Sequence, residues 1–491
     1  MKRVVVIGGG LGGLSAAIRL ATAGFSVTVL EQQPTLGGKL QRIQLGHYTF
    51  DRGPSTITMP EAFRRVFTSA GRKMEDYIQL YKLNEGTRNI FSDGTTVDLS
   101  SDLEAVESQI SAYSLEDAAQ YKSFMKESEI LYRLAECNFM TQILGWKEKL
   151  QPRMALAFAR VRPFMTMDKL LRRYFHHPNT IAMFGRYATY VGSSPWSAPA
   201  IFGMLPHMEN ALGIYGVKGG TYAIVEGFSR LARELGVTIK TGVRVTRILS
   251  RNGRAVGVST DQGYYDADYI VANGDVLSVC EELLDDKDRG AMSRKKVTEY
   301  EPSLSGFVQL VGVKQEYPQL LHHNVFYPNT YSEEFQDLFI HRVPPSDPAI
   351  YVCHSGHSER GMAPEGASNL FILVNAPYLS DLVNWDNPFT KQYGERILDK
   401  LASLGIEGLR DAEVRMSYTP LQLKQDTSAY RGAIYGISSN SPRQTFARPS
   451  NRGPISGLWF VGGTTHPGGG TPMVAMSGQL VAESLIKHSG V

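Results

Sequence analysis

The chain has 491 residues, more than one hydrophobic core usually supports, so we expect at least two folded units. Its 51 Lys and Arg against 48 Asp and Glu leave a net charge of +3, which lacks the basic excess of a nucleic-acid-binding protein, and no nucleic-acid partner is expected. The three cysteines are far apart and odd in number, which disfavours a disulfide framework and predicts a cytoplasmic protein.

The start of the chain has the pattern of a strand, a glycine turn, a helix and a second strand. Residues 3–7 are β-branched, the apolar positions of 11–23 have helical spacing that ends at Gly24, and residues 26–30 alternate as a strand. The run at 3–7 is too short for an export signal, and no run of about 18 apolar residues predicts a membrane-spanning helix. The pattern predicts a Rossmann-type βαβ unit.

Further short strands are predicted in the middle of the chain and near its end. They lie at 238–240, 243–249, 255–260, 269–272 and 458–461, and the last is followed by a glycine turn and a helix at 471–486. We therefore predict an α/β (α+β) protein with a Rossmann-type nucleotide domain built from non-contiguous segments and a second domain of mixed sheet and helices. The predicted boundaries are 1–80, 211–294 and 436–491 for the first domain, and 81–210 and 295–435 for the second.

Glycines stand between the first predicted strand and helix. The motif is Gly8-x-Gly10-x-x-Gly13, with Gly12 inside it. Glycines here permit a tight turn and let the backbone approach a pyrophosphate, which then lies at the positive N-terminus of the helix. Glu31 ends the second strand, where an acid can hydrogen-bond the ribose hydroxyls of an adenine dinucleotide. The motif and the acid together predict a dinucleotide site.

Two further segments favour FAD over NAD. Gly37-Gly38-Lys39 follows the acid, and this Glu-x5-Gly-Gly extension resembles the long dinucleotide fingerprint of two-domain flavin oxidoreductases. The sequence at 459–463, which ends in Gly462-Gly463, resembles the second FAD-contacting segment of the same families. Because no cysteine follows Cys353 in the sequence, we expect the FAD to be held non-covalently.

Motifs outside the nucleotide fingerprint indicate a family. They are 50–55 (FDRGPS), 190–192 (YVG), 431–436 (RGAIYG) and 465–470 (THPGGG). Together they resemble the bacterial carotenoid desaturase (phytoene desaturase) family from end to end of the chain. The resemblance implies a long apolar carotenoid substrate, O2 or a quinone as electron acceptor, and peripheral attachment to the inner face of the cell membrane.

Four segments resemble one branch of that family more specifically. They are 7–20 (IGGGLGGLSAAIRL), 190–194 (YVGSS), 317–324 (YPQLLHHN) and 468–474 (GGGTPMV), and in the last of these Met473 stands where desaturases commonly have Gly. The branch contains the diapocarotenoid oxygenases, and the resemblance implies oxidation of a terminal methyl group of an acyclic C30 carotenoid to an aldehyde. A phytoene or dehydrosqualene desaturase is the alternative, because both reactions begin with loss of an allylic hydride to the flavin. A flavin amine oxidase and a non-catalytic flavin- or carotenoid-binding scaffold are more remote alternatives.

The motifs and the resemblance together imply a set of site residues. Cofactor contacts are expected from Gly8, Gly10, Gly12, Gly13, Glu31, Gly37, Gly38, Lys39, Gly53, Pro54, Ser55, Val245, Gly462, Gly463, Gly470, Met473 and Val474. Candidate catalytic residues are His466, Asp51 and Arg52. His466 has a structural alternative as a turn residue held by the backbone, and Asp51 has one as an acid that closes a turn.

Two other features of the sequence bear on function. His322-His323 and the pair His354 and His357 come without a third ligand at a recognisable spacing, so no metal site is predicted. Residues 146–173, which include Trp146, carry eight Lys or Arg against two acids. Leu150, Met154, Phe158 and Val161 fall on one helical face of this segment. The segment predicts a helix that docks on anionic lipid, and the alternative is a surface helix whose apolar face packs on the protein.

Overall fold

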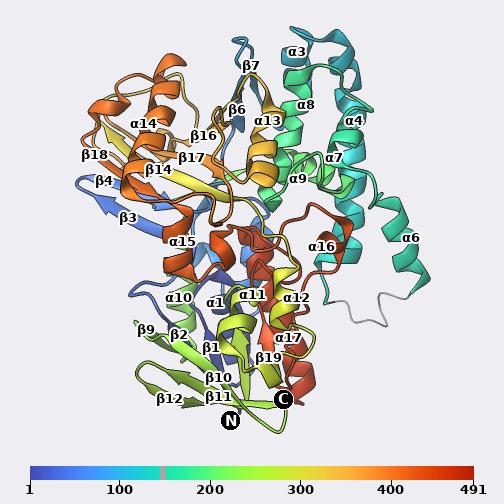
Figure 1. The fold of residues 1–491 in the computed structure, drawn as a ribbon, viewed down its shortest axis with the longest axis vertical. Coiled ribbons are helices and arrows are strands. Elements are labelled where there is room, and N and C mark those ends of the chain that lie inside the picture. The colour runs from blue at the N-terminus through green and yellow to red at the C-terminus, as the bar shows by residue number, and fades with distance from the viewer. Residues whose placement is uncertain (144–150, 491) are drawn as a thin grey trace.

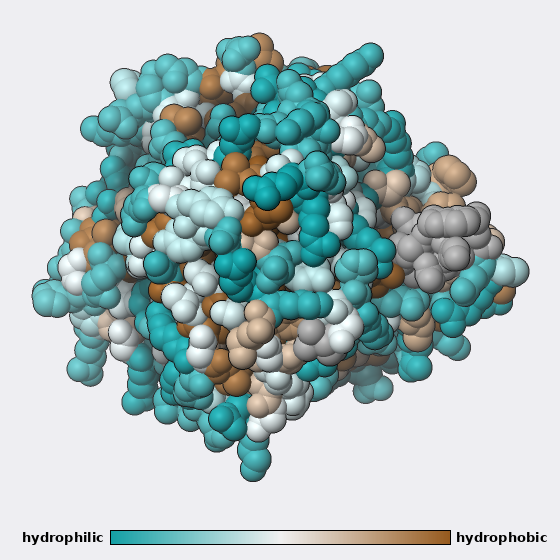
Figure 2. Space-filling model, turned by 90° about the horizontal axis from the view of Figure 1, so that it is seen from below, coloured by the Kyte–Doolittle hydropathy of each residue, from teal (hydrophilic) through white to brown (hydrophobic). Residues whose placement is uncertain are grey.

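The computed structural model describes residues 1–143 and 151–490. Figure 1 shows two parts stacked along the long axis, with a parallel sheet and both termini in the lower part and a larger sheet beside a group of helices in the upper part. Seen from the end that carries the termini, apolar residues lie in small groups among hydrophilic ones (Figure 2). Residues from both parts line one large cavity.

A five-stranded sheet with the order β19-β13-β1-β2-β9 forms the centre of the lower part. Every neighbouring pair in it is parallel. Its strands are β1 (Arg3–Ile7), β2 (Ser26–Glu31), β9 (Thr238–Thr241), β13 (Tyr269–Ala272) and β19 (Leu458–Phe460). The sheet thus joins the beginning, the middle and the end of the chain, which confirms the Rossmann-type architecture built from non-contiguous segments.

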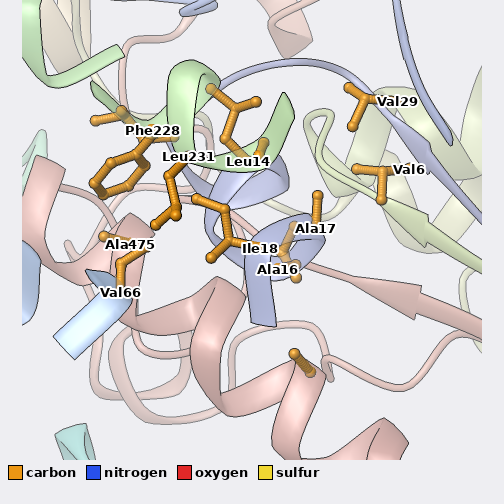
Figure 3. Packing of buried hydrophobic residues seen from close by; sticks show 14 of the residues in the cluster. Val6, Leu14, Ala16, Ala17, Ile18, Val29, Val66, Phe228, Leu231 and Ala475 are labelled. Atoms are coloured by element: carbon orange, nitrogen blue, oxygen red, sulfur yellow. The ribbon is translucent and has the colours of Figure 1, made fainter. Parts of the chain in front are cut away.

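Both faces of this sheet are buried, because successive side chains of a strand point to opposite faces. Val4 and Val6 of β1 pack with helices, whereas Val5 and Ile7 pack with a small antiparallel sheet. Figure 3 shows Leu14 and Ile18 of the first helix among the helical residues of this core. The covering elements are α1 (Leu11–Thr22), α2 (Pro60–Thr68), α10 (Ala223–Glu234), α17 (Thr471–Ser489), β10 (Val245–Arg251), β11 (Arg254–Thr260) and β12 (Gly263–Asp266).

Helices α1 and α17 approach each other closely. A Cβ atom on Gly478 would lie 2.4 Å from the carbonyl oxygen of Gly12, so only glycine fits there. The Ser15 hydroxyl donates to the Ala475 carbonyl at 2.7 Å, and the Gln479 amide donates to the Ser15 carbonyl at 3.0 Å. This packing fixes the N-terminal ends of both helices beside the same cavity.

A seven-stranded sheet with the order β18-β14-β17-β16-β15-β6-β7 forms one side of the upper part. Its neighbouring strands are antiparallel except for β15 and β6, which are parallel. The strands are β6 (Thr87–Ile90), β7 (Thr96–Asp98), β14 (Ser305–Val313), β15 (His323–Phe326), β16 (Ile350–Cys353), β17 (Ser368–Ala376) and β18 (Val414–Tyr418). Helix α14 (Asn387–Ser403) covers its outer face through Tyr393, Ile397 and Leu401.

Helices form the other side of the upper part (Figure 1). They are α3 (Leu103–Ser111), α4 (Leu115–Ala135), α6 (Pro152–Arg160), α7 (Met167–Leu171), α8 (Pro178–Gly185), α9 (Leu205–Leu212), α13 (Tyr331–Gln336) and α16 (Pro442–Phe446). The connecting elements are β3 (Gln41–Leu45), β4 (Tyr48–Arg52), β5 (Leu80–Lys82), β8 (Tyr215–Val217), α11 (Val276–Ser278), α12 (Arg294–Thr298) and α15 (Pro420–Thr427). The helices share a buried cluster that reaches the sheet at Val325.

The basic segment at 146–173 contains two helices where the structure describes it, and Met154 and Val161 of its predicted apolar face are buried in the protein. Trp146 and Leu150 lie outside the described residues. Helices α6 and α7 are separated at Arg162, which adopts a φ of +51° and precedes Pro163, so the helix cannot continue. Within 1–143 and 151–490, no helix has the length and the apolar character needed to cross a membrane.

Candidate active site

A cavity of about 1200 Å³ runs between the two parts of the molecule. The turns that follow β1, β13 and β19 line its lower end, and β14 to β17 with the helical group line its upper end. Sites for one small ligand typically enclose roughly 300–1,000 Å³. The volume therefore suits a dinucleotide cofactor together with a second, long ligand.

The turn between β1 and α1 brings bare backbone to the cavity. Gly8 has a φ of +93°, a backbone conformation that residues other than glycine rarely adopt. A Cβ atom on Gly13 would lie 2.3 Å from the Gly8 carbonyl oxygen, and one on Gly10 would lie 2.8 Å from the Asn273 amide. Gly10 and Leu11 line the cavity at the start of α1, where the first N–H groups of the helix have no acceptor within the helix. This cradle fits a pyrophosphate group.

Glu31 lies buried at the end of β2 and lines the cavity. Its carboxylate accepts hydrogen bonds from the backbone N–H groups of Gly9 and Gln33, at 2.7 and 2.8 Å. Burial raises the pKa of Glu31, and these backbone hydrogen bonds lower it. The two bonds fix the carboxylate at the wall, where its remaining lone pairs can accept from ribose hydroxyls.

Lys39 joins the Gly37-Gly38 turn to the RGAIYG segment at 431–436. Its Nζ donates to the carbonyl of Ala433 at 3.2 Å and to the carbonyl of Ile434. Burial lowers the pKa of Lys39, and the nearby Asp275 carboxylate raises it. Lys39 therefore holds two segments that are far apart in the sequence on the same cavity wall.

The THPGGG segment at 465–470 lies between β19 and α17. The His466 carbonyl accepts hydrogen bonds from the Asn451 amide and the Ser477 hydroxyl, both at 2.9 Å, and the residue lines the cavity. Arg448 donates to the Gly463 carbonyl at 3.3 Å, and burial lowers the pKa of Arg448 to about 10. The backbone of the turn is thus held from behind, while His466, Pro467 and the start of α17 line the cavity.

Most of the residues predicted to contact the cofactor line this cavity. They are Gly8, Gly10, Glu31, Gly37, Gly38, Lys39, Gly53, Pro54, Ser55, Val245, Gly462, Gly463, Gly470, Met473 and Val474. Gly12 and Gly13 lie behind the cradle, where Gly13 packs on Gly8 and Gly12 packs on Val474. These two glycines position the turn and do not line the cavity.

Asp51 and Arg52 are adjacent in the sequence, but only Arg52 lines the large cavity. Asp51 accepts hydrogen bonds from the backbone N–H groups of Thr221 and Tyr222 at the start of α10, and it is outside the residues that line the large cavity. An acid in this place satisfies N–H groups that the helix leaves without acceptors, as the structural alternative for Asp51 expects. Arg52 does line the cavity, where it pairs with Asp426 at 3.2 Å and lies 3.8 Å from the Tyr418 ring.

Sequence reasoning missed three polar residues of the lower cavity. Asn273 and Asp275 directly follow β13, and Arg448 precedes β19. Polar residues just after a parallel strand were a usable signal for the first two, because ligands of such sheets bind at the carboxyl ends of the strands. Arg448 carried no such signal in the sequence.

The upper cavity is lined mainly by apolar side chains. Val308, Phe371 and Leu373 come from the seven-stranded sheet, and Phe202 and Met208 come from the helical side. Such walls offer few hydrogen-bonding groups and exclude water from whatever they enclose. The arrangement fits a long hydrocarbon chain.

A buried histidine pair lies next to a cysteine outside the lower cavity. The potential ligand atoms of His322, His323 and Cys353 lie within 4.8 Å of one another, because Cys353 of β16 pairs with His323 of β15. Burial lowers the pKa of His322 to about 3, lowers the pKa of His323 well below its ordinary value, and raises the pKa of Cys353 to about 12. All three groups are therefore neutral near pH 7.

Comparison with known proteins extends these observations. Residues 11–486 match the family described as flavin containing amine oxidoreductase. The chain is 37% identical to 4,4'-diapolycopene oxygenase from Methylomonas sp, over 99% of this chain and 98% of the relative. It is 35% identical to 4,4'-diaponeurosporene oxygenase from Staphylococcus haemolyticus (strain JCSC1435), over 99% of this chain and 97% of the relative.

Solved structures resemble the fold. Cyclohexylamine oxidase from Brevibacterium oxydans IH-35A superposes with a TM-score of 0.65 at 14% identity, over all of both chains (100% and 100%). An oxidoreductase from Methanosarcina mazei gives a TM-score of 0.61 at 18% identity, over 98% of this chain and 100% of the other. At such identities the likeness bears on the fold, which is an amine-oxidase-like architecture with the Rossmann-type part and the second, mixed part that the sequence predicts. This chain belongs to the flavin-containing amine oxidoreductase family and is an FAD-dependent oxidoreductase.

Proposed function

We propose that the protein oxidises the terminal methyl group of an acyclic C30 carotenoid to an aldehyde. The observation that carries this proposal is the similarity, at 37% and 35% identity over nearly the whole chain, to relatives named as oxygenases of 4,4'-diapolycopene and 4,4'-diaponeurosporene. The apolar upper cavity supports it, because a carotenoid is a long hydrocarbon. Both features agree on the substrate class.

The residues of the chain bind, orient and desolvate the reactants in this proposal. Bound FAD supplies a hydride acceptor. The glycine cradle and Glu31 hold the dinucleotide, and Val308 and Leu373 help to enclose the polyene away from water. A conjugated chain spreads the positive charge that develops as the hydride leaves, so the step requires no strong acid or base. His466 is then the candidate that orients the flavin or handles a proton, and Arg52, which is paired with Asp426, lines the cavity wall.

The product distinguishes this oxidation from a desaturation. The gene should be expressed in cells that make 4,4'-diaponeurosporene or 4,4'-diapolycopene, and the pigments analysed by mass spectrometry. A polyene that has gained one oxygen and lost two hydrogens supports the terminal oxidation. Loss of hydrogen pairs alone from an upstream precursor supplied in parallel, with no oxygen gained, would identify a desaturase.

We propose O2 or a quinone as the electron acceptor. The proposal rests on the same family resemblance. It is tested by comparing turnover in air with turnover in oxygen-free buffer that contains a soluble quinone. Turnover under neither condition would contradict it.

We also propose that the surface around α6 docks on the membrane. Phe164 is 85% exposed and Leu156 is 54% exposed, and basic residues including Arg153 and Arg160 are exposed beside them. Phe158 of α6 packs on Phe446 with ring centroids 4.9 Å apart, and Phe446 lines the cavity. The docking surface therefore adjoins the cavity wall, which gives an apolar substrate a short path from lipid.

Binding to vesicles tests this docking. The double variant Leu156→Ser and Phe164→Ser should bind vesicles with anionic headgroups about tenfold more weakly, because both side chains would lose burial in the bilayer. Leu382→Ser is the matched control, because Leu382 is 64% exposed on another segment. Equal binding of the double variant and the wild type would contradict the assignment.

A further inference from the structure

The guanidinium of Arg186 lies in the wall of the apolar upper cavity. Arg186 is 6% exposed and begins a 3₁₀ helix, Arg186–Val191, directly after α8. Its Nη1 donates to the Tyr190 hydroxyl at 3.3 Å. Its Nε and Nη2 have no hydrogen-bond partner among residues 1–143 and 151–490. A buried cation with two donors that the described residues leave unsatisfied thus lies in the lining of a cavity that is otherwise suited to hydrocarbon.

The nearest buried acid does not satisfy these donors. No ion pair to Arg186 is found in the part of the chain that the structure describes. Glu209 instead accepts a hydrogen bond from the Tyr187 hydroxyl at 2.5 Å, and burial raises the pKa of Glu209. The positive charge of Arg186 is therefore not matched by direct contact with a carboxylate.

A second polar group, the hydroxyl of Tyr331, also lacks a hydrogen-bond partner among the described residues. This hydroxyl is buried, and Tyr331 lines the same cavity. Its ring is fixed by Tyr327 and Phe335, with centroids 5.6 and 5.1 Å away. Buried donors are nearly always satisfied, and an unsatisfied charged group is especially unfavourable. A bound ligand that carries an acceptor would satisfy both residues.

A hydrocarbon polyene offers no such acceptor. We propose that Arg186 and Tyr331 form a subsite for an oxygen atom on the end group of a long apolar ligand, as a hydroxyl, an aldehyde carbonyl or a carboxylate. The identity of this ligand as a C30 polyene rests on the proposed function. The oxygen has two sources, either the end that has just been oxidised or the opposite end of a chain oxidised earlier.

Binding of a coloured ligand tests the subsite directly. FAD-loaded enzyme is titrated with a C30 polyene that has one terminal aldehyde and, separately, with the corresponding hydrocarbon. Hydrogen bonding of the guanidinium to the carbonyl should shift the aldehyde absorption to longer wavelength, and Arg186→Met should abolish the shift. Arg186→Met should also lower the affinity for the aldehyde about tenfold or more relative to the hydrocarbon, the size expected for a hydrogen bond from a charged group.

Further variants keep the test independent of folding. Arg186→Met combined with Glu209→Gln removes the acid that the single variant would leave without a nearby cation. Tyr331→Phe loses no hydrogen bond within the described protein and should lower the relative aldehyde affinity about threefold to tenfold. Tyr317→Phe is its matched control, because the Tyr317 hydroxyl donates to the Glu407 carbonyl at 2.6 Å and Tyr317 does not line the cavity.

Turnover separates the two sources of the oxygen. If Arg186→Met raises KM for conversion of a terminal alcohol to the aldehyde at the same end, the subsite holds the reacting end. If it raises KM only for oxidation of the second end of the mono-aldehyde, the subsite holds the opposite end. Either result supports the subsite, and binding of the aldehyde with an Arg186-dependent shift would support it even if the wild type oxidised no hydrocarbon.

Two results would overturn the subsite. One is an aldehyde absorption that is the same in the wild type and in Arg186→Met. The other is an equal loss of affinity for aldehyde and hydrocarbon in both Arg186 variants, which would give Arg186 a purely structural role or a cavity water as its partner. Terminal oxidation of the hydrocarbon by the wild type in the same series would leave the proposed function intact in either case.

Discussion

The two ends of the cavity are built by different means. At the lower end, bare backbone at Gly8 and Gly10, backbone-held Glu31 and the anchored His466 turn form the wall. At the upper end, side chains of a sheet and of helices form the wall, and Arg186 is a buried cation among them. A wall made of backbone requires particular residues at particular spacings, whereas many combinations of side chains can enclose the same apolar volume. Substitutions at the two ends should therefore impair different properties of the protein.

The largest effect is expected at the glycine cradle. Gly13→Ala places a Cβ atom 2.3 Å from the Gly8 carbonyl oxygen, so the turn must shift. We expect loss of bound FAD and a free energy of unfolding lower by about 3 kcal/mol. Flavin absorbance of the purified protein and urea unfolding measure the two effects. Gly185→Ala is the control, because its Cβ atom would meet no atom closer than 3.6 Å; equal behaviour of the two variants would contradict the close packing.

A buried acid should make the upper part sensitive to pH. Burial raises the pKa of Glu334 to about 7, although Ala349 N–H and the Asn375 amide donate to its carboxylate. Because the folded protein holds this proton more tightly than the unfolded chain, Glu334 contributes stability below about pH 5 that is lost as the pH rises to about 7.

Glu334→Gln imitates the protonated acid and should remove this loss. Its free energy of unfolding should rise relative to the wild type by about 2 kcal/mol between about pH 5 and about pH 8. Urea unfolding of both proteins across this range is the measurement. A difference that does not change with pH would show that Glu334 keeps an ordinary pKa.

Filling the upper cavity should separate substrate binding from cofactor binding. Gly306 of β14 lines the cavity, and a Cβ atom there would lie 3.0 Å from Cδ1 of Ile434, a flexible side-chain end that can move. Gly306→Leu should therefore keep FAD but lower polyene turnover about tenfold, because the added side chain occupies the space of the substrate. Flavin content and turnover are measured on the same sample. Loss of FAD with this variant would contradict the division of the cavity into two ends.

The smallest effect is expected at Asp51. Asp51→Ala leaves two N–H groups at the start of α10 without their acceptor, so the free energy of unfolding should fall by about 1 kcal/mol. The flavin spectrum and kcat should not change, because Asp51 lies outside the residues that line the large cavity. A large fall in kcat with unchanged stability would instead place Asp51 in the chemistry.

The contrast between the two ends also explains what the sequence could predict. The strand predicted at 3–7 is β1, and the helix predicted at 11–23 is α1 (Leu11–Thr22), because glycine turns and apolar periodicity are local signals. Asp51 was expected near the flavin because it stands inside a recognisable motif. The hydrogen bonds that assign it to α10 come from residues about 170 positions away, which no local pattern reveals.

The upper part was less predictable for the same reason. The turn at Arg162, which separates α6 from α7 in the segment 146–173, has a left-handed backbone that no propensity rule predicts. Arg186 is one of many Arg and Lys residues in the sequence, and only the packing of Tyr187, Tyr190 and their neighbours makes it a buried cation. The cluster of His322, His323 and Cys353 likewise depends on strand pairing.

Oxidation of a hydrocarbon polyene by the purified, FAD-loaded protein tests the central claim most directly. The protein is mixed with 4,4'-diaponeurosporene without oxygen, the flavin absorbance is followed, air is then admitted, and the pigment is analysed by mass spectrometry. Terminal oxidation predicts bleaching of the flavin by the polyene and a product with one oxygen gained and two hydrogens lost. Bleaching with loss of hydrogens only, or no bleaching and no product, would contradict it.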